Sequence, residues 1–206
     1  MEIYFSKSNP EYLQPRKYLK YLFMKKKIVS VFSFAFLAFA AFAQDSNPVV
    51  GGAAMYPTRN IIENAVNSKD HTTLVAAVKA AGLVDALQTA GPFTVFAPTN
   101  NAINLLPAGT VDILLKPENK TQLQNVLKYH VVAGNWSASS VVEMIKKNNN
   151  KWMIETLQGG KIYASLDDKG QVWLWDENGG KSMVTITDVN QSNGVIHVID
   201  HVLLPK

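Results

Sequence analysis

Two histidines and an aspartate near the C-terminus have the residue types and the spacing that metal binding would use. His197 and His201 lie four positions apart, and Asp200 precedes the second of them. On a helix, side chains four positions apart are neighbours and could share one zinc ion. On a strand, four residues at about 3.3 Å each separate them by roughly 13 Å, too far for bonds of about 2.0–2.1 Å to one ion. The surrounding β-branched residues favour the strand, so the sequence predicts no metal site.

Other catalytic signatures are missing or isolated. The chain has no cysteine, no Gly-x-Ser-x-Gly motif, no phosphate-binding loop and no dinucleotide fingerprint. Asp167 and Asp168 are adjacent in a Gly-containing turn, where such residues are typical for conformational reasons. An enzyme would require His130 or His197 to meet a carboxylate at the base of a cleft. We therefore expect a protein that is not an enzyme and that has no cofactor.

Both histidines lie in a strongly apolar stretch at the C-terminal end of the sequence. Residues 194–205 read GVIHVIDHVLLP, and seven of the twelve are Val, Ile or Leu. Asn193-Gly194 is a turn signal, and Pro205 ends the segment. Alternation places residues on two faces that are both mainly apolar. We therefore predict a strand over residues 194–205 in the middle of the core, with the C-terminus threaded into the fold.

The first residues have the pattern of a secretory signal peptide. Three lysines at 25–27 precede an apolar run over 28–42, and Ala41-Phe42-Ala43 forms an A-x-A cleavage site before Gln44. The run is shorter than the roughly 20 residues that span a bilayer. We predict a leader over residues 1–43, with Met24 as a possible true start, and a secreted or periplasmic protein without a membrane span after cleavage. A retained N-terminal anchor is the alternative.

The leader also accounts for the positive charge of the whole chain. It holds seven Lys and Arg against two Asp and Glu, whereas the rest holds thirteen against fourteen. A nearly neutral mature chain lacks the clustered basic residues of a nucleic-acid-binding protein. Without cysteine, the exported protein must be stabilised by core burial. We predict a flexible tether over residues 44–57 and one domain over residues 58–206.

Helical segments come first in this domain and strand segments afterwards. Helices are predicted at residues 60–67, 74–80, 82–87, 100–106, 111–115, 121–127 and 140–147. The expected N-caps are Thr72 or Thr73, Thr99, and either Ser137 or Ser139. Strands are predicted at residues 93–97, 129–132, 151–156, 161–166, 171–175 and 182–189. Since the last four are joined by Gly-containing turns typical of hairpins, the fold class is α+β.

Three stretches together resemble the signatures of a known family. They are TVFAPT at residues 94–99 followed by Asn-Asn-Ala, the pair Tyr129-His130, and NGVIHVIDHVLLP at residues 193–205. Their order resembles that of fasciclin-like domains of the beta-Ig-H3/fasciclin family, over about residues 58–205. The resemblance implies two small β-sheets forming a wedge with several short helices packed around it. It also implies an extracytoplasmic adhesion or matrix-interaction module without catalysis. Ile103 departs from the family, which usually has an aromatic residue there.

The resemblance also implies candidate partner-binding residues. The integrin-contact tract of animal members, Asn-Lys-Asp-Ile-Leu, aligns with residues 186–190, where only Asp188 matches. A second contact motif, a Tyr-His pair flanked by branched aliphatic residues, matches Tyr129 and His130. Tyr129, His130 and Asp188 are therefore candidates for partner contact. For the pair, the alternative is a structural strand with a hydrogen-bonded histidine.

An aromatic stripe is expected on one face of the strand-rich half. If Leu174 points to the core, alternation along residues 161–166 and 171–175 places Tyr163, Trp173 and Trp175 on the opposite face. Clustered exposed aromatic residues are typical of recognition surfaces. We therefore add these three residues to the candidate partner-binding site. The alternative is that helices or the tether cover them as a second core layer.

The sequence thus predicts a secreted adhesion module that interacts with a cell-surface or matrix protein or glycan, in a bacterial envelope or matrix. Because one domain binds weakly, self-association or dense display would provide multivalency. The alternative is an extracytoplasmic carrier of a small apolar ligand or a glycan, which a large apolar pocket would favour.

Overall fold

Strand β9 (Gly194–Ile199) lies inside the main sheet of the computed structural model, which describes residues 47–206. It pairs in parallel with β3 (Phe93–Pro98) and antiparallel with β8 (Lys181–Gln191). All the residues of β9 are buried, which confirms that this segment is a strand in the middle of the core. The predicted leader, residues 1–43, lies outside the described residues.

The strand is shorter than the sequence predicted. It ends at Ile199, where the Asp200 carboxylate instead accepts hydrogen bonds from the Met183 backbone N–H at 2.7 Å and from Ser182 Oγ at 3.1 Å. The chain bends there, and His201 is exposed. Leu203 is nevertheless fully buried, so the segment beyond the strand still packs against the core.

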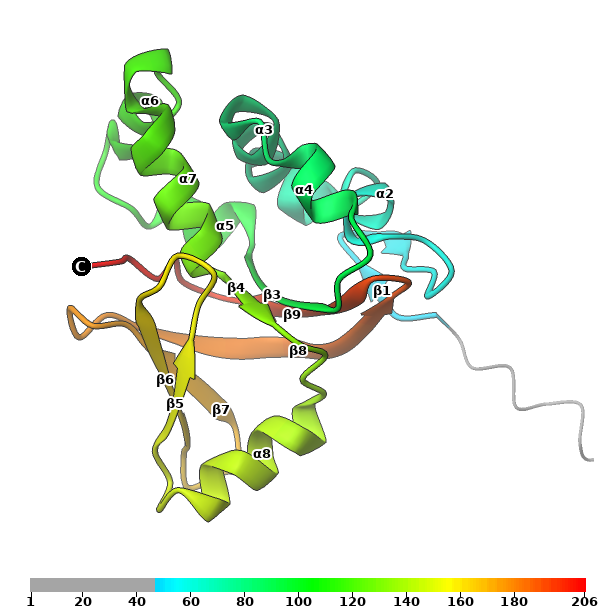
Figure 1. The fold of residues 1–206 in the computed structure, drawn as a ribbon, viewed down its shortest axis with the longest axis vertical. Helices are drawn as coiled ribbons and strands as arrows, with labels where there is room; N and C mark the ends of the chain where they lie inside the picture. Colours follow the sequence, from blue (N-terminus) through cyan, green and yellow to red (C-terminus); the bar gives the residue numbers. More distant parts are fainter. Residues whose placement is uncertain (1–46) are drawn as a thin grey trace, which may run out of the picture. The chain divides into compact units, whose positions relative to one another are not determined.

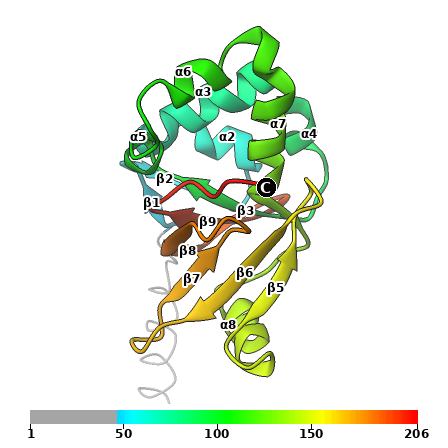
Figure 2. The same ribbon diagram turned by 90° about the vertical axis from the view of Figure 1, so that its left-hand side faces the viewer.

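The main sheet contains seven strands in the order β4-β3-β9-β8-β7-β6-β5 (Figure 1; Figure 2). Its other members are β4 (Val131–Ala133), β5 (Trp152–Glu155), β6 (Lys161–Leu166) and β7 (Val172–Trp175). The long strand β8 belongs to both halves of the sheet, and its register against β9 shifts twice between Val184 and Val189. Since such bulges bend and twist a strand, the two small sheets expected from the sequence are joined through β8. The α+β fold class is confirmed.

Helices cover both sides of this sheet (Figure 1). One side carries α2 (Ile61–Ala65), α3 (Thr72–Ala81), α4 (Val84–Gln88), α5 (Asn100–Asn104), α6 (Thr110–Leu114) and α7 (Lys120–Tyr129). On the other side, α8 (Ala138–Lys147) packs against β5 and β6. The caps at Thr99 and Ser137 are confirmed, because they accept hydrogen bonds from the backbones of Ala102 and Ser140. The cap expected at Thr72 or Thr73 is wrong, because α3 already includes both residues and has no side-chain cap. Within residues 47–206, no helix combines the length and the hydropathy that crossing a membrane requires.

Separate apolar cores form on the two sides of the sheet. Between α8 and β5–β7, the core contains Val141, Ile145, Ile154, Ile162 and Leu174. On the side of the other helices, side chains of β3 and β9 pack against those of α2 and of the N-terminal segment, among them Val50, Met55, Ile61, Val95, Ile196 and Val198. The sheet is therefore covered on both faces near β9.

The expected tether over residues 44–57 is wrong for its described part. Residues 49–54 form a hairpin of β1 (Val49–Val50) and β2 (Ala53–Ala54). Val50 and Met55 are 4% and 2% exposed. Their burial against β3 and β9 stabilises a segment whose composition has no periodicity, which is why the sequence alone did not reveal it.

The strand predicted at residues 129–132 begins later than expected. Tyr129 is the last residue of α7, and His130 caps that helix. Only Val131 and Val132 of the predicted range pair with β3. The two valines and the tyrosine suggested a strand. The first two residues instead end the helix, where the His130 N–H donates a hydrogen bond to the Leu127 carbonyl at 3.2 Å.

One buried side chain connects the turn before β9 to two helices. The side-chain Oδ1 of Asn193 accepts a hydrogen bond from the Ile61 N–H at 3.0 Å, at the start of α2. Its amide donates to the carbonyls of Leu87 and Thr89 at 2.8 and 2.9 Å, at the end of α4. Asn193 is 5% exposed, so these backbone groups have little access to water as an alternative partner.

We predict that Asn193→Ala lowers the free energy of unfolding by about 2–4 kcal/mol, because it leaves buried backbone groups unpaired. Chemical denaturation followed by circular dichroism measures this. Asn148→Ala is the matched control, since Asn148 is exposed and bonds only to the neighbouring Met144 carbonyl. The control should change stability by about 0.5 kcal/mol or less, and an equal effect of both substitutions would contradict the prediction.

Candidate functional site

The outer face of β5–β7 carries the aromatic residues that the sequence singled out. Leu174 is fully buried toward α8, and alternation places Trp173 and Trp175 on the opposite face. Tyr163 lies directly across from Trp175, and Ser165 lies across from Trp173. Trp175 is 38% exposed and the other two rings are half-buried. We call these three residues the outer aromatic face.

Hydrogen bonds and cations hold these rings in place. The indole N–H of Trp175 donates to Ser165 Oγ at 3.0 Å, and that of Trp173 donates to Asp167 Oδ2 at 3.2 Å. Lys181 Nζ lies 5.3 Å and 5.9 Å from the centroids of Trp173 and Trp175. The Lys151 ammonium lies 4.7 Å from the centre of the Tyr163 ring. The rings are therefore preorganised, with cations within reach of their faces.

A shallow depression beside these rings combines apolar and polar groups. Its volume is about 570 Å³. The rings of Tyr163 and Trp175 contribute its apolar part, and its polar part comes from Asn150, Lys151, Ser165, Asp176, Glu177 and Lys206. Mixed lining of this kind suits a ligand that presents an apolar surface together with hydrogen-bonding groups.

The candidate residues Tyr129 and His130 lie inside the fold. Tyr129 is fully buried, and its hydroxyl donates to the Lys161 carbonyl. His130 is 4% exposed; its Nδ1 donates to the Val126 carbonyl at 2.8 Å, and its Nε2 accepts from the Leu203 N–H at 3.1 Å. These contacts attach the C-terminal segment to α7. The burial of both side chains speaks against direct contact with a partner, and the pair occupies a helix end where the sequence suggested a strand.

Asp188 also makes internal contacts. It lies in the irregular part of β8 with a φ of 55°, and its Oδ1 accepts from the Ala138 N–H at 2.8 Å, at the start of α8. Its own N–H donates to Nδ1 of His197 at 3.3 Å, and Nε2 of His197 donates to the Trp136 carbonyl at 2.8 Å. Asp188 therefore positions α8 on the sheet.

The histidines do not form a shared reactive centre in the described part of the chain. His197 lies in β9, whereas His201 lies beyond its end and pairs with Asp200 at 2.9 Å. Within residues 47–206, no group of three His, Cys, Asp or Glu side chains is arranged to hold a metal ion. Both nitrogens of His130 and of His197 contact backbone atoms, so neither imidazole is directly paired with a carboxylate.

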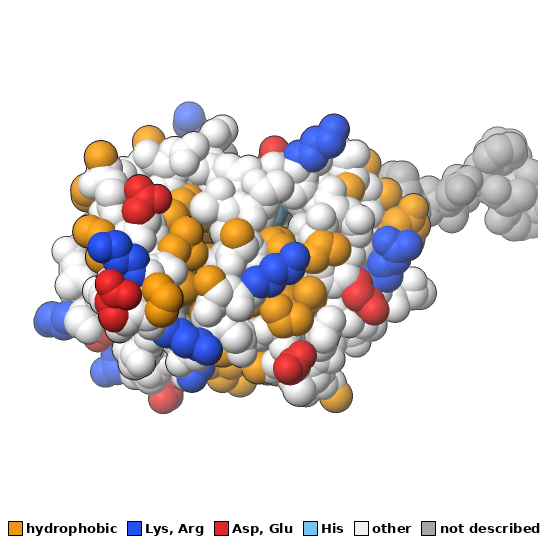
Figure 3. Space-filling view, turned by 90° about the horizontal axis from the view of Figure 1, so that it is seen from above, with side chains coloured by type: hydrophobic (Ala, Val, Ile, Leu, Met, Phe, Trp, Pro, Cys, Tyr) orange, Lys and Arg blue, Asp and Glu red, His pale blue; other side chains and the backbone are white. Residues whose placement is uncertain are grey.

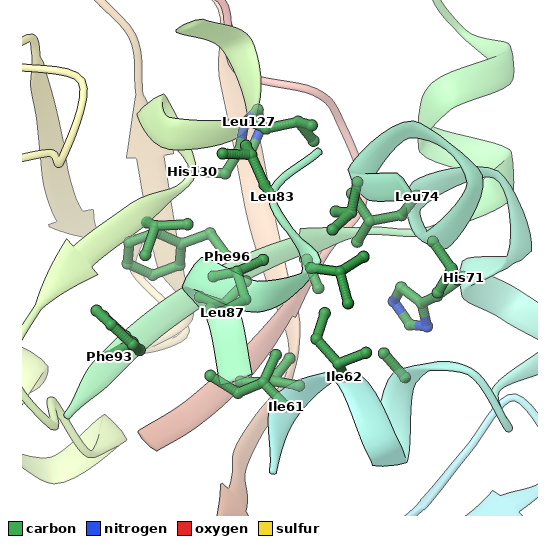
Figure 4. A pocket seen from close by; sticks show the side chains of 18 of the residues that line it. Ile61, Ile62, His71, Leu74, Leu83, Leu87, Phe93, Phe96, Leu127 and His130 are labelled. Carbon is green, nitrogen blue, oxygen red and sulfur yellow. The ribbon is translucent and has the colours of Figure 1, made fainter. Parts of the chain in front are cut away.

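The carrier alternative from the sequence required an apolar pocket between the sheet and the helices, and the structure has an apolar cavity of about 450 Å³ there (Figure 4). Sequence reasoning named none of the residues that line it. Side chains of α2, α3, α4 and α7 line it from one side, and those of β3 and β9 from the other. Its lining comes from segments far apart in the chain, each of which looks like ordinary core. The only available signal was the excess of apolar residues on the short helices.

Burial lowers the pKa of both His130 and His197, opposed by the carbonyls of Val126 and Trp136. A lowered folded pKa means that the unfolded chain binds protons more tightly. Stability is therefore fully present above the unfolded pKa of about 6.5 and is lost as the pH falls below it.

We predict that the free energy of unfolding decreases as the pH falls from about 6.5 to 5, with a slope of up to about 1.4 kcal/mol per pH unit for each buried histidine. Urea denaturation at a series of pH values measures this slope. His197→Gln should reduce this slope, because it removes one of the buried imidazoles. A wild-type slope of zero over this range would contradict the prediction.

Comparison with known proteins identifies the family. The family model described as Fasciclin domain matches residues 69–205. Protein sll1483 of Synechocystis sp. is 45% identical over 161 residues, covering 78% of this chain and 82% of that protein. Transforming growth factor-beta-induced protein ig-h3 of Sus scrofa is 33% identical over 149 residues, covering 72% of this chain but 20% of that protein.

Among solved structures, a FAS1 domain pair from the insect cell adhesion molecule Fasciclin I aligns with a TM-score of 0.62. The alignment covers 71% of this chain and 51% of that chain at 19% identity, so it supports the fold alone. The family model matches about two thirds of the chain, and a relative that is 45% identical is covered over 82% of its length. The chain belongs to the fasciclin domain family.

Proposed function

We propose that this domain is an extracytoplasmic, non-enzymatic adhesion module that binds a cell-surface or matrix partner through the outer aromatic face. Membership of the fasciclin family supports adhesion, because a solved member with the same fold is a cell adhesion molecule. We choose this surface because Tyr163, Trp173 and Trp175 lie together on a face of the sheet that no described helix covers (Figure 2).

The physical properties of this face suit recognition. Tyr and Trp are enriched among the residues that dominate binding energies, because they bury large areas and retain a polar group. Here the hydrogen bonds of Trp173 and Trp175 already hold the rings. Binding therefore loses little side-chain entropy, which leaves more of the contact energy as affinity.

A glycan is the partner class that the depression fits best. A sugar ring presents an apolar face of C–H groups and an edge of hydroxyls. The rings of Tyr163 and Trp175 match the first, and Asn150, Ser165 and Glu177 offer donors and acceptors for the second. A matrix or cell-surface protein is the other partner class that this surface would take.

The proposal assigns no catalysis. His130 and His197, the imidazoles that an active site would have used, contact backbone groups inside the fold. Because a single domain of this size offers one such face, useful adhesion would require dense display or self-association. A second candidate function, that of a carrier for a small apolar ligand, is favoured by the cavity beneath the helices.

We predict that the double variant Trp173→Ala, Trp175→Ala binds its partner at least about tenfold more weakly than the wild type, since loss of aromatic anchors commonly costs 2 kcal/mol or more. The measurement is a glycan array together with a panel of matrix proteins, followed by titration of the best binder. Tyr56→Ala is the matched control, because Tyr56 is 40% exposed and lies outside β5–β7.

Retention of full affinity by the double variant would exclude this face. Binding to matrix proteins but to no glycan would keep the face and change the partner class. Unfolding curves of both variants separate loss of binding from loss of structure.

The predicted signal peptide can be tested separately. Cleavage after Ala43 would leave a mature chain that begins at Gln44. Intact-mass measurement of the protein from the envelope and secreted fractions of its host should give the mass of residues 44–206. A mass that includes the apolar run over residues 28–42 would indicate a retained anchor instead.

A further inference from the structure

The apolar cavity has the size of a ligand site. Its volume of about 450 Å³ falls within the range of roughly 300–1,000 Å³ that is typical of small-molecule sites. Protein interiors otherwise contain few voids larger than a water molecule. Most of the lining consists of aliphatic side chains, including Ile62, Leu74, Val78, Leu87, Val95 and Val198. Water gains few hydrogen bonds there, so an apolar occupant is favoured.

One polar side chain within this lining lacks a partner. His71 is 4% exposed, and its Nδ1 lies 2.9 Å from Ser68 Oγ. Its Nε2 is buried and is the only such side-chain nitrogen or oxygen within residues 47–206 that has no hydrogen-bond partner. Figure 4 shows the imidazole among the lining side chains near Leu74 and Ile62. An unpaired buried polar atom is destabilising, and a ligand atom in hydrogen-bond contact with it would remove that cost.

The charge state of this histidine restricts the ligand. Burial lowers the pKa of His71. The Asp70 carboxylate opposes this effect, and so does the Ala97 carbonyl, which lies near the ring without the geometry of a hydrogen bond to Nε2. The imidazole is therefore neutral near neutral pH. No Asp or Glu lines the cavity, and its ammonium groups, Lys79 and Lys128, belong to exposed residues. A charged group deep in the cavity would lose its hydration without a counter-charge.

The tautomer of His71 restricts the ligand further. If Ser68 donates to Nδ1, Nε2 carries the proton and needs an acceptor; if Ser68 accepts, Nε2 needs a donor. A carbonyl group satisfies only the first arrangement. A hydroxyl group satisfies either, because it is both donor and acceptor.

We propose that this cavity binds a neutral, largely apolar molecule that carries one hydroxyl group, and that the hydroxyl forms a hydrogen bond with Nε2 of His71. This site lies on the helical side of β3 and β9, away from β5–β7. It is therefore independent of the outer aromatic face, and its failure in an experiment would leave the adhesion proposal unaffected.

The test uses two probes of nearly equal size, 2-naphthol and 2-methylnaphthalene, which differ in a hydroxyl against a methyl group. Calorimetric titration against wild type and His71→Phe gives four dissociation constants. We expect His71→Phe to weaken the binding of 2-naphthol about 3- to 10-fold, which corresponds to the loss of one hydrogen bond. The affinity for 2-methylnaphthalene should stay unchanged or increase. Equal changes for both probes, or binding of neither, would overturn the proposal.

A second measurement on the wild type does not depend on the variant. The His71 ring nitrogen resonances should shift with 2-naphthol and not with 2-methylnaphthalene. Methyl resonances of Ile61, Ile62 and Ile196 should shift with both probes, whereas those of Ile145 and Ile162, in the core under α8, should not. Shifts confined to other methyl groups would place the probes outside the cavity.

A third probe distinguishes an amphiphilic anion. Figure 3 shows basic side chains next to apolar ones on the helical side of the molecule. If 2-naphthoate binds more tightly than 2-naphthol and loses this advantage in Lys79→Gln, Lys128→Gln, the site recognises an anion through these exposed lysines of its lining. That outcome would overturn the assignment of a neutral hydroxyl ligand.

Discussion

The structure depends on the burial of β9, which has a partner on each edge and a core on each face. A strand in this position has little contact with water. The rest of the chain must therefore provide a hydrogen-bonded strand along each edge and an apolar layer over each face. The parallel partner β3 lies about a hundred residues earlier in the sequence, which requires a long connection. That connection contains α5–α8 and β4–β8, with α7 on one side of the sheet and α8 on the other.

The irregular strand β8 determines how many surfaces remain for binding. Its shifts of register turn the sheet between β9 and β7, so that α8 covers only one side of β5–β7 and the other side remains open. Asp188 stabilises this turn, because its carboxylate binds the start of α8 while its backbone binds His197. A residue that the family resemblance marks as a partner contact thus has a structural role.

The buried histidines show how surroundings rather than residue type decide a role. His130 and His197 each have two backbone partners, and they hold the C-terminal segment and β8 in place. His71 has one partner and lines an apolar cavity with its second nitrogen free. Burial lowers the pKa of all three. Only His71 has hydrogen-bonding capacity left for a ligand.

The family and the α+β class could be predicted from the sequence, and so could most elements, because these follow from residues close together in the chain. Thr99 and Ser137 have side chains that cap the next turn. Alternation over a few residues places Trp173 and Trp175 opposite Leu174. Such patterns are local, since a strand alternates and a helix repeats whatever surrounds it.

Tertiary structure alone decided the features that depend on distant partners. The hairpin at Val50 has a Gly51-Gly52 turn, but its strands are too short to be recognised from the sequence, and β3 and β9 stabilise it by apolar cover. Tyr129 looks like part of a strand and lies in a helix, because non-local packing overrides weak propensity. The cavity and the free nitrogen of His71 arise where short helices meet the sheet. No stretch of sequence encodes such a space, since its walls come from segments that are brought together only when the chain folds.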